Sequence, residues 1–357
     1  MIRDDLGELR PMIRRPVLRA GILPVPYEDE IHLRLLGRLL IASGKNVRDV
    51  LMRLLGVLDG SRTVAELEAE VSGPVQESLR VLEQAGLLRD AEPVADLARW
   101  TERHPAVFRF FDALMSDPYS ALRALEKAKV MLFSAGNLIE PFVEKLTSFG
   151  VSQLNIASCD SAQGARAGNM EARLLTYNSG DGERFERELA PLIEGQDMVL
   201  VALDAWSPPL LRSVNRISQQ TGTPLLPMAQ VHEGEFLIGP MVVPGETACW
   251  QCMELRMKSN WHMMDTYEAA FERYVEEHSW AARYSTGTPA AFYAAASSLA
   301  VIEAVKWIIS GEVYMRTLNQ VLVFRPFVPE TEVSPVLKLP RCPACGNTKP
   351  PVRVWMQ

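Results

Sequence analysis

The chain has 357 residues, a length that favours two or three domains, and 48% of them are hydrophobic, as in a globular protein with a sizeable core. Its formal net charge of -7 disfavours nucleic acid as a partner, because proteins that bind nucleic acid usually present a basic face. The first residues, MIRDDLGELRPMIRR, are charged throughout and lack the apolar run of a signal peptide, so we expect a cytoplasmic protein.

Residues 1–92 form the first predicted domain. Two short strands are expected within 31–44, and helices within 46–60 and 73–90 place their apolar residues on one face. Strands followed by helices, the last of them amphipathic, are typical of a winged helix. Residues 93–127 follow as a helical connector rich in aromatic and apolar side chains.

Local signals mark the ends of the helices in this first domain. Thr63 and Glu66 have the Thr-x-x-Glu spacing of a capping box, which predicts a helix start. Gly86 ends the last helix, and Leu87 and Leu88 then begin a short closing strand.

The remaining residues, 128–357, are predicted to form a doubly wound α/β domain. The run 129–160 reads as an apolar strand, a glycine turn, a helix and a second strand, which is a βαβ unit. The pattern continues with a strand at 197–204, a helix at 208–221 and a strand at 223–231. Alternating strands and helices predict a mostly parallel sheet with both faces covered.

The most membrane-like stretch is AAFYAAASSLAVIEAVKWIIS, residues 290–310. Glu303 and Lys306 interrupt it, and its small residues suit a buried helix of a soluble domain. We therefore expect no membrane partner.

Two Cys-x-x-Cys pairs stand far apart in the chain, Cys249 with Cys252 and Cys342 with Cys345. Structural disulfides are rare in a reducing cytosol, and neither pair has the strand-to-helix setting of a thioredoxin-like redox centre. Four unrelated free cysteines are the remaining alternative. Four thiolates are what a closed tetrahedral zinc site needs, so we interpret the pairs as one structural zinc site. Cys159 is left over and is expected to be a small buried hydrophobe.

The second half of the chain resembles the ubiquitin-activating-type, ThiF-like adenylating fold. The resemblance is carried by the strand before SAGNLI, by Asp160, by the strand that ends at Asp204, and by VPGETACWQC joined to a late CPACG. It spans about residues 128–357 and implies that the two cysteine pairs hold one structural zinc ion.

The first half resembles the precursor-peptide recognition element of ribosomal peptide (RiPP) biosynthesis, in the run LDGSRTVAEL followed by GLL. Together the two halves resemble the ThiF-like partner proteins of YcaO cyclodehydratases, which form azolines from Cys, Ser or Thr in thiopeptide and linear azol(in)e (TOMM) pathways. The resemblance implies that this chain binds the leader of a precursor peptide and delivers it to a YcaO partner that performs the ATP-dependent chemistry. ThiF-like proteins are often dimers, so a homodimer is an open expectation.

The resemblance places a nucleotide site at Gly136, Asp160 and Asp204, but the usual G-x-G-x-x-G turn is altered. Ser134 and Ile139 stand where its outer glycines belong. Each lost phosphate or ribose contact costs about 1–3 kcal/mol, so we expect a vestigial site, no ATP and no catalytic residues. Asp204 has two open interpretations: a Mg-associated aspartate, or a strand-end residue that caps the next helix.

An exposed strand edge at residues 38–43 can accept an extended peptide by β-augmentation. Specificity would come from the groove between this strand and the third helix, where Arg80 can pair with an acidic leader residue. Glu83 would hold Arg80 in place or meet a basic leader residue; alternatively, the two are a solvated surface pair. The predicted peptide-binding residues are Arg38, Leu39, Leu40, Ile41, Gln76, Arg80 and Glu83.

Two other functions stay open at this level, and one aromatic segment has two interpretations. The chain is an active adenylating enzyme that uses ATP on a peptide carboxylate or amide, or a winged-helix DNA-binding regulator, which the acidic charge disfavours. Tyr267, Phe271 and Tyr274, at helical spacing within residues 265–278, are either packing residues or a docking face for a partner protein.

Overall fold

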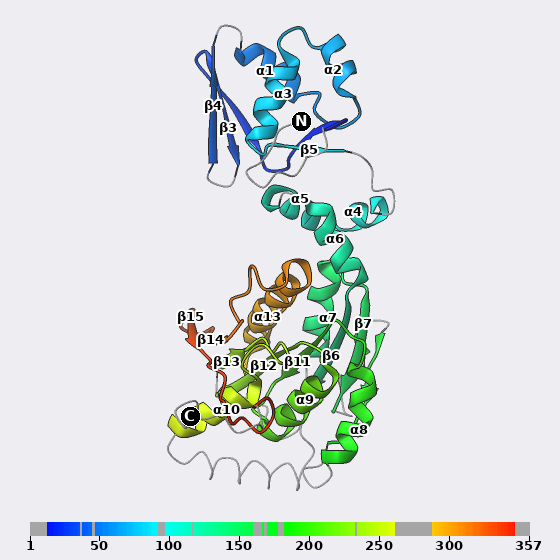
Figure 1. The fold of residues 1–357 in the computed structure, drawn as a ribbon, viewed down its shortest axis with the longest axis vertical. Helices are drawn as coiled ribbons and strands as arrows, with labels where there is room; N and C mark the ends of the chain where they lie inside the picture. Colours follow the sequence, from blue (N-terminus) through cyan, green and yellow to red (C-terminus); the bar gives the residue numbers. More distant parts are fainter. Residues whose placement is uncertain are drawn as a thin grey trace, which may run out of the picture. The chain divides into compact units, whose positions relative to one another are not determined.

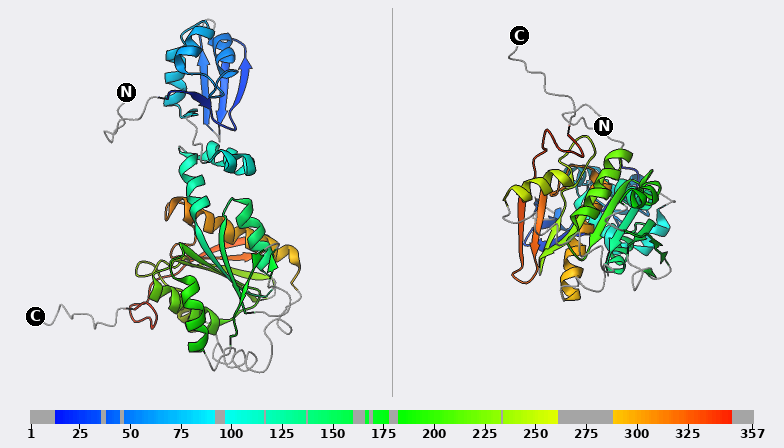
Figure 2. Two further views of the ribbon diagram at one scale, coloured as in Figure 1. Left: turned by 90° about the vertical axis from the view of Figure 1, so that its right-hand side faces the viewer. Right: turned by 90° about the horizontal axis from the view of Figure 1, so that it is seen from below.

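The computed structural model describes residues 13–346, except 36–37, 45–46, 92–96, 116, 137, 160–165, 168–169, 178–181, 233 and 261–287. The chain divides into two compact units, Met1–Arg123 and Ala124–Gln357. Each unit has its own sheet and core (Figures 1 and 2). The boundaries predicted from the sequence, 1–92, 93–127 and 128–357, stay predictions.

The first unit carries a small antiparallel sheet and several short helices. Its sheet has the strand order β2-β3-β4, and the strand before this sheet, β1, pairs antiparallel with the late strand β5. Its elements are β1 (Pro16–Leu18), β2 (Leu23–Tyr27), β3 (Glu30–Leu35), β4 (Arg38–Ser43), α1 (Val47–Leu55), α2 (Val64–Glu70), α3 (Val75–Gln84), β5 (Leu88–Asp90), α4 (Ala98–Arg103) and α5 (Pro105–Leu114), followed by α6 (Pro118–Lys127).

Several sequence predictions for this unit are confirmed. The two strands expected within 31–44 are β3 and β4, and the capping box of Thr63 and Glu66 starts α2 with both of its hydrogen bonds present. The closing strand is β5, which pairs with β1. Strand β2, which supplies the far edge of the small sheet, was not expected from the sequence.

A buried ion pair holds α5 against this unit. Arg89, on β5, lies 2.8 Å from Asp112 Oδ1, and the Ala20 amide donates to Asp112 Oδ2 at 2.8 Å. Arg89 also donates to the Tyr119 hydroxyl at 2.8 Å and lies over the ring of Phe108. Asp112 is almost fully buried, so removal of the Arg89 charge would leave a buried carboxylate unpaired and would destabilise the fold. These contacts make α5 an integral part of the first unit.

The second unit is a layered α/β domain. Helices cover both faces of its large sheet (Figure 1). Its main elements are β6 (Lys129–Ala135), α7 (Ile139–Ser148), β7 (Gln153–Ser158), β10 (Arg173–Leu174), α8 (Gly182–Ile193), β11 (Met198–Leu203), α9 (Pro208–Thr221), β12 (Leu225–His232), β13 (Glu235–Ile238), α10 (Trp250–Asn260), α13 (Ala290–Ser310), β14 (Gln320–Arg325) and β15 (Glu330–Pro335); the two-residue strands β8 (Arg166–Ala167) and β9 (Met170–Glu171) pair separately.

The large sheet has the order β10-β7-β6-β11-β12-β13-β14-β15. The first five strands run parallel, as the alternating pattern predicted, but the last three pair antiparallel. Short turns join β12 to β13 and β14 to β15, and a short turn can join only antiparallel strands. Strands β14 and β15 were not expected from the sequence.

Helix α13 is long and apolar enough to cross a membrane by length and composition alone. It packs against α7, β12 and β13 and buries Ala296, Ala300 and Ala304. It also buries the carboxylate of Glu303, which accepts hydrogen bonds from the Arg316 and Thr317 amides. These contacts are those of a core helix, as expected from its small residues.

Candidate functional site

The structure brings together the four cysteines of the two Cys-x-x-Cys pairs. Cys249 immediately precedes α10 and Cys252 lies in its first turn, while Cys342 and Cys345 follow β15. Their Sγ atoms all lie within 4.8 Å of one another, and three of the four residues are buried. The candidate metal centre therefore joins the late CPACG loop to the start of α10.

The sulfur geometry matches a zinc site. Cys249 Sγ lies 3.8 Å from Cys252 Sγ and 3.6 Å from Cys342 Sγ, and Cys252 Sγ lies 3.4 Å from Cys345 Sγ. Tetrahedral coordination with Zn–S bonds of ~2.3 Å places sulfur atoms ~3.8 Å apart. The cluster can therefore hold a metal such as zinc with little rearrangement, and four thiolates would leave no coordination position for a substrate.

The backbone around the cysteines fits this role. The Leu339 amide donates to Cys252 Sγ at 3.4 Å, and the Gly346 amide donates to the Cys342 carbonyl at 2.8 Å. A Cβ on Gly346 would lie 2.4 Å from that carbonyl oxygen, so only glycine fits the end of the CPACG loop. Hydrogen bonds to sulfur and a tight loop are what hold thiolates in place around a metal.

The thiols of Cys249 and Cys252 differ in pKa. The hydrogen bond from Cys249 lowers the pKa of Cys252 far below that of an ordinary thiol, and the same bond raises the pKa of Cys249. Cys252 also lies at the N-terminus of α10, where the helix dipole favours a negative charge. Both effects favour the thiolate form of Cys252, which is the form that binds a metal.

Helix α10, which carries Cys252, is anchored to α9 by a buried carboxylate. Glu254 is 1% exposed and accepts a bidentate interaction from Arg212 on α9, and Lys258 lies 3.6 Å from the same carboxylate. This ion pair was not apparent in the sequence, because its partners lie far apart in the chain. The Arg212–Glu254 ion pair therefore holds in place the start of α10, where Cys249 and Cys252 lie.

The topological switch point of the large sheet lies between β6 and β11, because the chain leaves β6 toward β7 on one side and returns to β11 on the other. Ligands of doubly wound sheets bind at the carboxyl ends of such strands. Here these ends carry Gly136 and Asp204, so the structure brings together two of the residues expected at a nucleotide site. The third, Asp160, lies outside the described residues.

Gly136 and Asp204 are packed directly against each other. Gly136 has a φ of +96°, and a Cβ built on it would lie 1.9 Å from the Asp204 carboxylate. Any side chain at position 136 would therefore collide with the Asp204 carboxylate, so the turn can carry only glycine here. The N-cap of α9 is Ser207, so Asp204 does not occupy the capping position suggested as its alternative role.

The two residues that replace the outer glycines are buried. Ser134 lies within β6, and its hydroxyl has no hydrogen-bond partner among the described residues. Ile139 is the first residue of α7 and is 2% exposed, so its side chain belongs to the core.

A polar network that the sequence did not reveal covers the neighbouring strand ends. Gln230, fully buried on β12, donates to the Thr288 hydroxyl at 2.7 Å and accepts from the Tyr293 hydroxyl at 2.6 Å. The Tyr293 hydroxyl also lies 3.3 Å from the Asp204 carbonyl oxygen. This network ties the start of α13 to the switch point.

In the first unit, the predicted peptide-binding strand is β4, and it is an edge strand of the small sheet. Leu39 and Ile41 are each 49% exposed, whereas Leu40 and Ala42 pack against the core. Arg38 begins the strand. The edge predicted for augmentation is therefore present.

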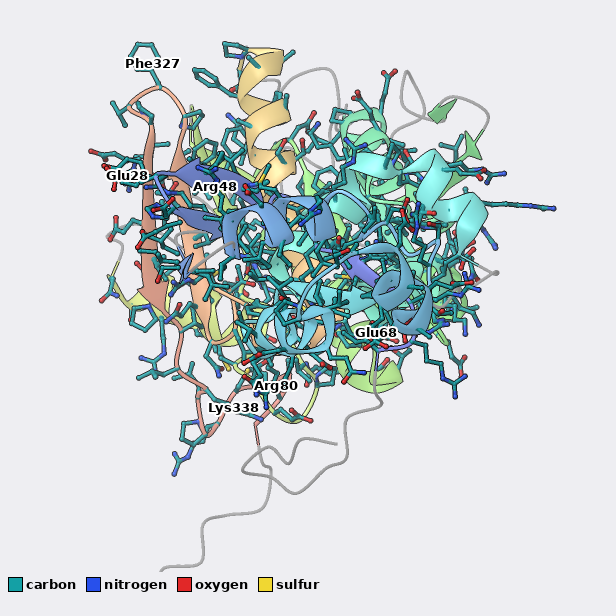
Figure 3. The ribbon with its side chains drawn as sticks, turned by 90° about the horizontal axis from the view of Figure 1, so that it is seen from above. Glu28, Arg48, Glu68, Arg80, Phe327 and Lys338 are labelled. Carbon is teal, nitrogen blue, oxygen red and sulfur yellow. The ribbon has the colours of Figure 1, made fainter. Side chains whose placement is uncertain are left out.

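The predicted helix residues lie on α3. Gln76 and Arg80 are exposed, and Glu83 is half-buried. Arg80 is labelled in Figure 3. The described contacts include no ion pair between Arg80 and Glu83, so Glu83 does not hold Arg80 as the sequence suggested. The helix that packs directly on β3 and β4 is α1. The groove that the sequence predicted between β4 and α3 therefore also involves α1.

The hydrogen-bonding direction of β4 follows from the prolines of β2. Pro24 and Pro26 have no N–H, so within the β2–β3 ladder they must be the residues that face away from β3. Alternation across both ladders then directs the N–H and C=O groups of Leu39, Ile41 and Ser43 to the free edge of β4.

The two edges of the small sheet therefore differ. The free edge of β2 presents prolines and lacks their N–H donors, which blocks strand addition. Its turn is held by Arg48 of α1, which donates to the Glu28 carbonyl at 2.6 Å (Figure 3). Only the β4 edge offers both donors and acceptors to an incoming strand.

A pocket of about 450 Å³ lies between α1 and the start of α3. Val47 and Val50 line it from α1, and Pro74 and Ser78 line it from the start of α3. Val47 also lies against Gly44, which directly follows β4, so the pocket is within reach of the end of the strand.

No protein-family model and no curated protein matches the chain. Among solved structures, E. coli MccB in complex with MccA-N7isoASN aligns with 15% identity and a TM-score of 0.63, over 93% of this chain and 99% of MccB. A heterocyclase in complex with substrate and cofactor aligns with 16% identity and a TM-score of 0.63, and the heterocyclase TruD with 15% and 0.60.

The alignments to the heterocyclases also cover 93% of this chain, but only 39% and 43% of those longer proteins. The chain therefore spans less than half their length. At these identities the likeness shows the fold alone: a mixed α/β architecture shared with MccB, in agreement with the ThiF-like fold expected from the sequence.

Proposed function

We propose that this chain is a noncatalytic peptide-recognition and scaffold protein of ribosomal peptide biosynthesis. In this role the first unit acts as a winged-helix recognition element that binds the leader of a precursor peptide. The second unit is a ThiF-like scaffold stabilised by zinc. The chain then presents the core of the peptide to a cytoplasmic YcaO cyclodehydratase, and tethering raises the concentration of the substrate at that partner's active site.

The observation that carries this proposal is the open edge of β4. Leu39, Ile41 and Ser43 direct backbone groups there that pair with no other described strand, while the opposite edge is blocked by proline. Backbone pairing supplies affinity with little demand on sequence, as a leader of variable sequence requires. Specificity for the leader can come from the side chains of Leu39, Ile41, Gln76 and Arg80, and from the pocket beside α1.

A scaffold role also agrees with the switch point. The Asp204 carboxylate occupies the space next to Gly136, where a triphosphate would have to approach. Without a bridging magnesium ion, like charges that share one site repel each other. The buried side chain of Ile139 further closes the start of α7.

Leader binding tests the proposal directly. A fluorescein-labelled leader, taken from the precursor gene beside the gene for this chain, is titrated with the full-length zinc-loaded protein and followed by fluorescence polarisation. We expect saturable binding at low micromolar concentration or tighter, and none with a scrambled leader of the same composition. Absence of binding by a folded, zinc-loaded protein would remove the recognition role.

The second candidate is an active adenylating enzyme, and the likeness to MccB favours it, because MccB has also been solved with ATP. Titration calorimetry with Mg-ATP separates the two. We expect no saturable binding below about 1 mM, because the phosphate contacts are lost.

Micromolar ATP binding that the substitution Asp204→Asn abolishes would instead identify Asp204 as a magnesium ligand. Peptide-dependent exchange of pyrophosphate into ATP would then establish adenylation and replace the scaffold proposal.

A further inference from the structure

The small sheet of the first unit has one largely exposed face. Its inner face buries Ile31 and Leu33, whereas the exposed apolar side chains of the outer face include Leu39 and Ile41 from β4 and Val25 from β2. We propose that this outer face, next to the open edge of β4, recognises two alternate side chains of the bound peptide, one acidic and one apolar. This inference rests on the proposed leader binding and names the class of peptide.

The strand register divides the outer face into rows. One row runs Leu23–Arg34–Leu39, and the next runs Val25–His32–Ile41. A strand added beside β4 extends each row by one residue, and residues two apart in that strand point to the same face. The peptide side chains on this face therefore lie next to Leu39 and next to Ile41.

The row of Leu39 carries the charge. Arg34 is exposed, and among the described residues it has no ion-pair or hydrogen-bond partner. Two strand spacings, ~10 Å in all, separate Arg34 from the added strand, and extended arginine and glutamate side chains together span that distance. A carboxylate in this row of the peptide would pair with Arg34 above the aliphatic surface of Leu39.

In the row of Ile41, Val25 and Ile41 are apolar, and the polar side chain of His32 already has a partner. His32 lies 3.1 Å from the Glu30 carboxylate, and its ring contacts that of Tyr27 at 5.6 Å between centroids. The carboxylate of Glu30 is therefore already engaged, and Ile41, 49% exposed, is the surface that an apolar peptide side chain would cover. The recognised pattern is acidic-x-apolar, or the reverse order, depending on the direction of the added strand.

Matched substitutions test each row with the labelled leader. We expect Arg34→Glu to weaken leader binding about fivefold, in line with the worth of an exposed charge pair. A leader whose acidic residue at the paired position is replaced by Lys should bind Arg34→Glu better than it binds the wild type. Arg109→Glu, which makes the same charge change on the exposed surface of α5, should change nothing.

The apolar row is tested by Ile41→Thr, which keeps the backbone and β-branching but weakens the contact; about a fivefold loss is expected. Val25→Thr, on the same face but beyond His32, should bind as the wild type does. Equal effects of Arg34→Glu and Arg109→Glu, or of Ile41→Thr and Val25→Thr, would overturn this inference while leaving leader binding intact. Failure of the wild type to bind the leader would remove both.

Discussion

Replacing Cys342 by Ser is expected to remove the metal and destabilise the second unit. Three thiolates cannot close the tetrahedral site, and structural zinc contributes about 10–16 kcal/mol of apparent binding free energy in small zinc domains. Part of that free energy is needed here, because the site is what joins the CPACG loop to α10. We expect zinc, measured by mass spectrometry, to fall from about one ion per chain to near zero, and the melting temperature to fall by about 10 °C or more.

Cys159 provides the matched control. It is the fifth cysteine of the chain and lies outside the four-sulfur cluster, so Cys159→Ser makes the same chemical change without touching the site. This variant should keep its zinc and most of its stability. A Cys342→Ser protein with wild-type zinc content and melting temperature would show that the four cysteines are not the metal ligands.

The zinc cluster was predictable because thiol chemistry is local to each motif. Cys249 and Cys252 form one half-site by spacing alone, and so do Cys342 and Cys345, so the fold has only to bring two ready halves together. The capping box at Thr63 was predictable for the same reason, since all its partners lie within one turn.

Strand β2 shows why local sequence patterns do not predict every element. Its sequence, LPVPY, carries two prolines, which argue against a strand in any sheet interior. They are tolerated here because β2 is an edge and both prolines face away from β3. A feature that lowers strand propensity is thus the feature that makes β4 the available edge, and only the register reveals it.

The switch point shows a related limit. The sequence indicated that the glycine turn had lost its outer glycines, yet it gave no reason for Gly136 to remain. The structure supplies one, because the Asp204 carboxylate packs where a Cβ would lie. Likewise, Gln230 and Tyr293 meet only through the packing of α13 on the sheet, so no local pattern could pair them.

Replacing Ile41 by Pro is expected to abolish leader binding while leaving the fold in place. The Ile41 N–H faces the free edge, so proline removes a donor to the peptide without removing a bond of the β3–β4 ladder. Pro24 and Pro26 already occupy equivalent outward positions in β2. We expect at least about a 30-fold loss of affinity by fluorescence polarisation, because the donor is lost and the proline ring obstructs the incoming strand.

Ile41→Val is the control for this change, since it keeps the N–H and a β-branched side chain, and it should bind nearly as the wild type does. Methylating single backbone nitrogens of the leader tests the same edge without altering the protein. Because successive residues of a strand point their N–H groups in opposite directions, methylation should weaken binding at every second position within the paired segment. Equal tolerance at all positions, together with binding by Ile41→Pro, would mean that the leader binds elsewhere. An alternating loss would instead identify the residues of the leader that pair with β4.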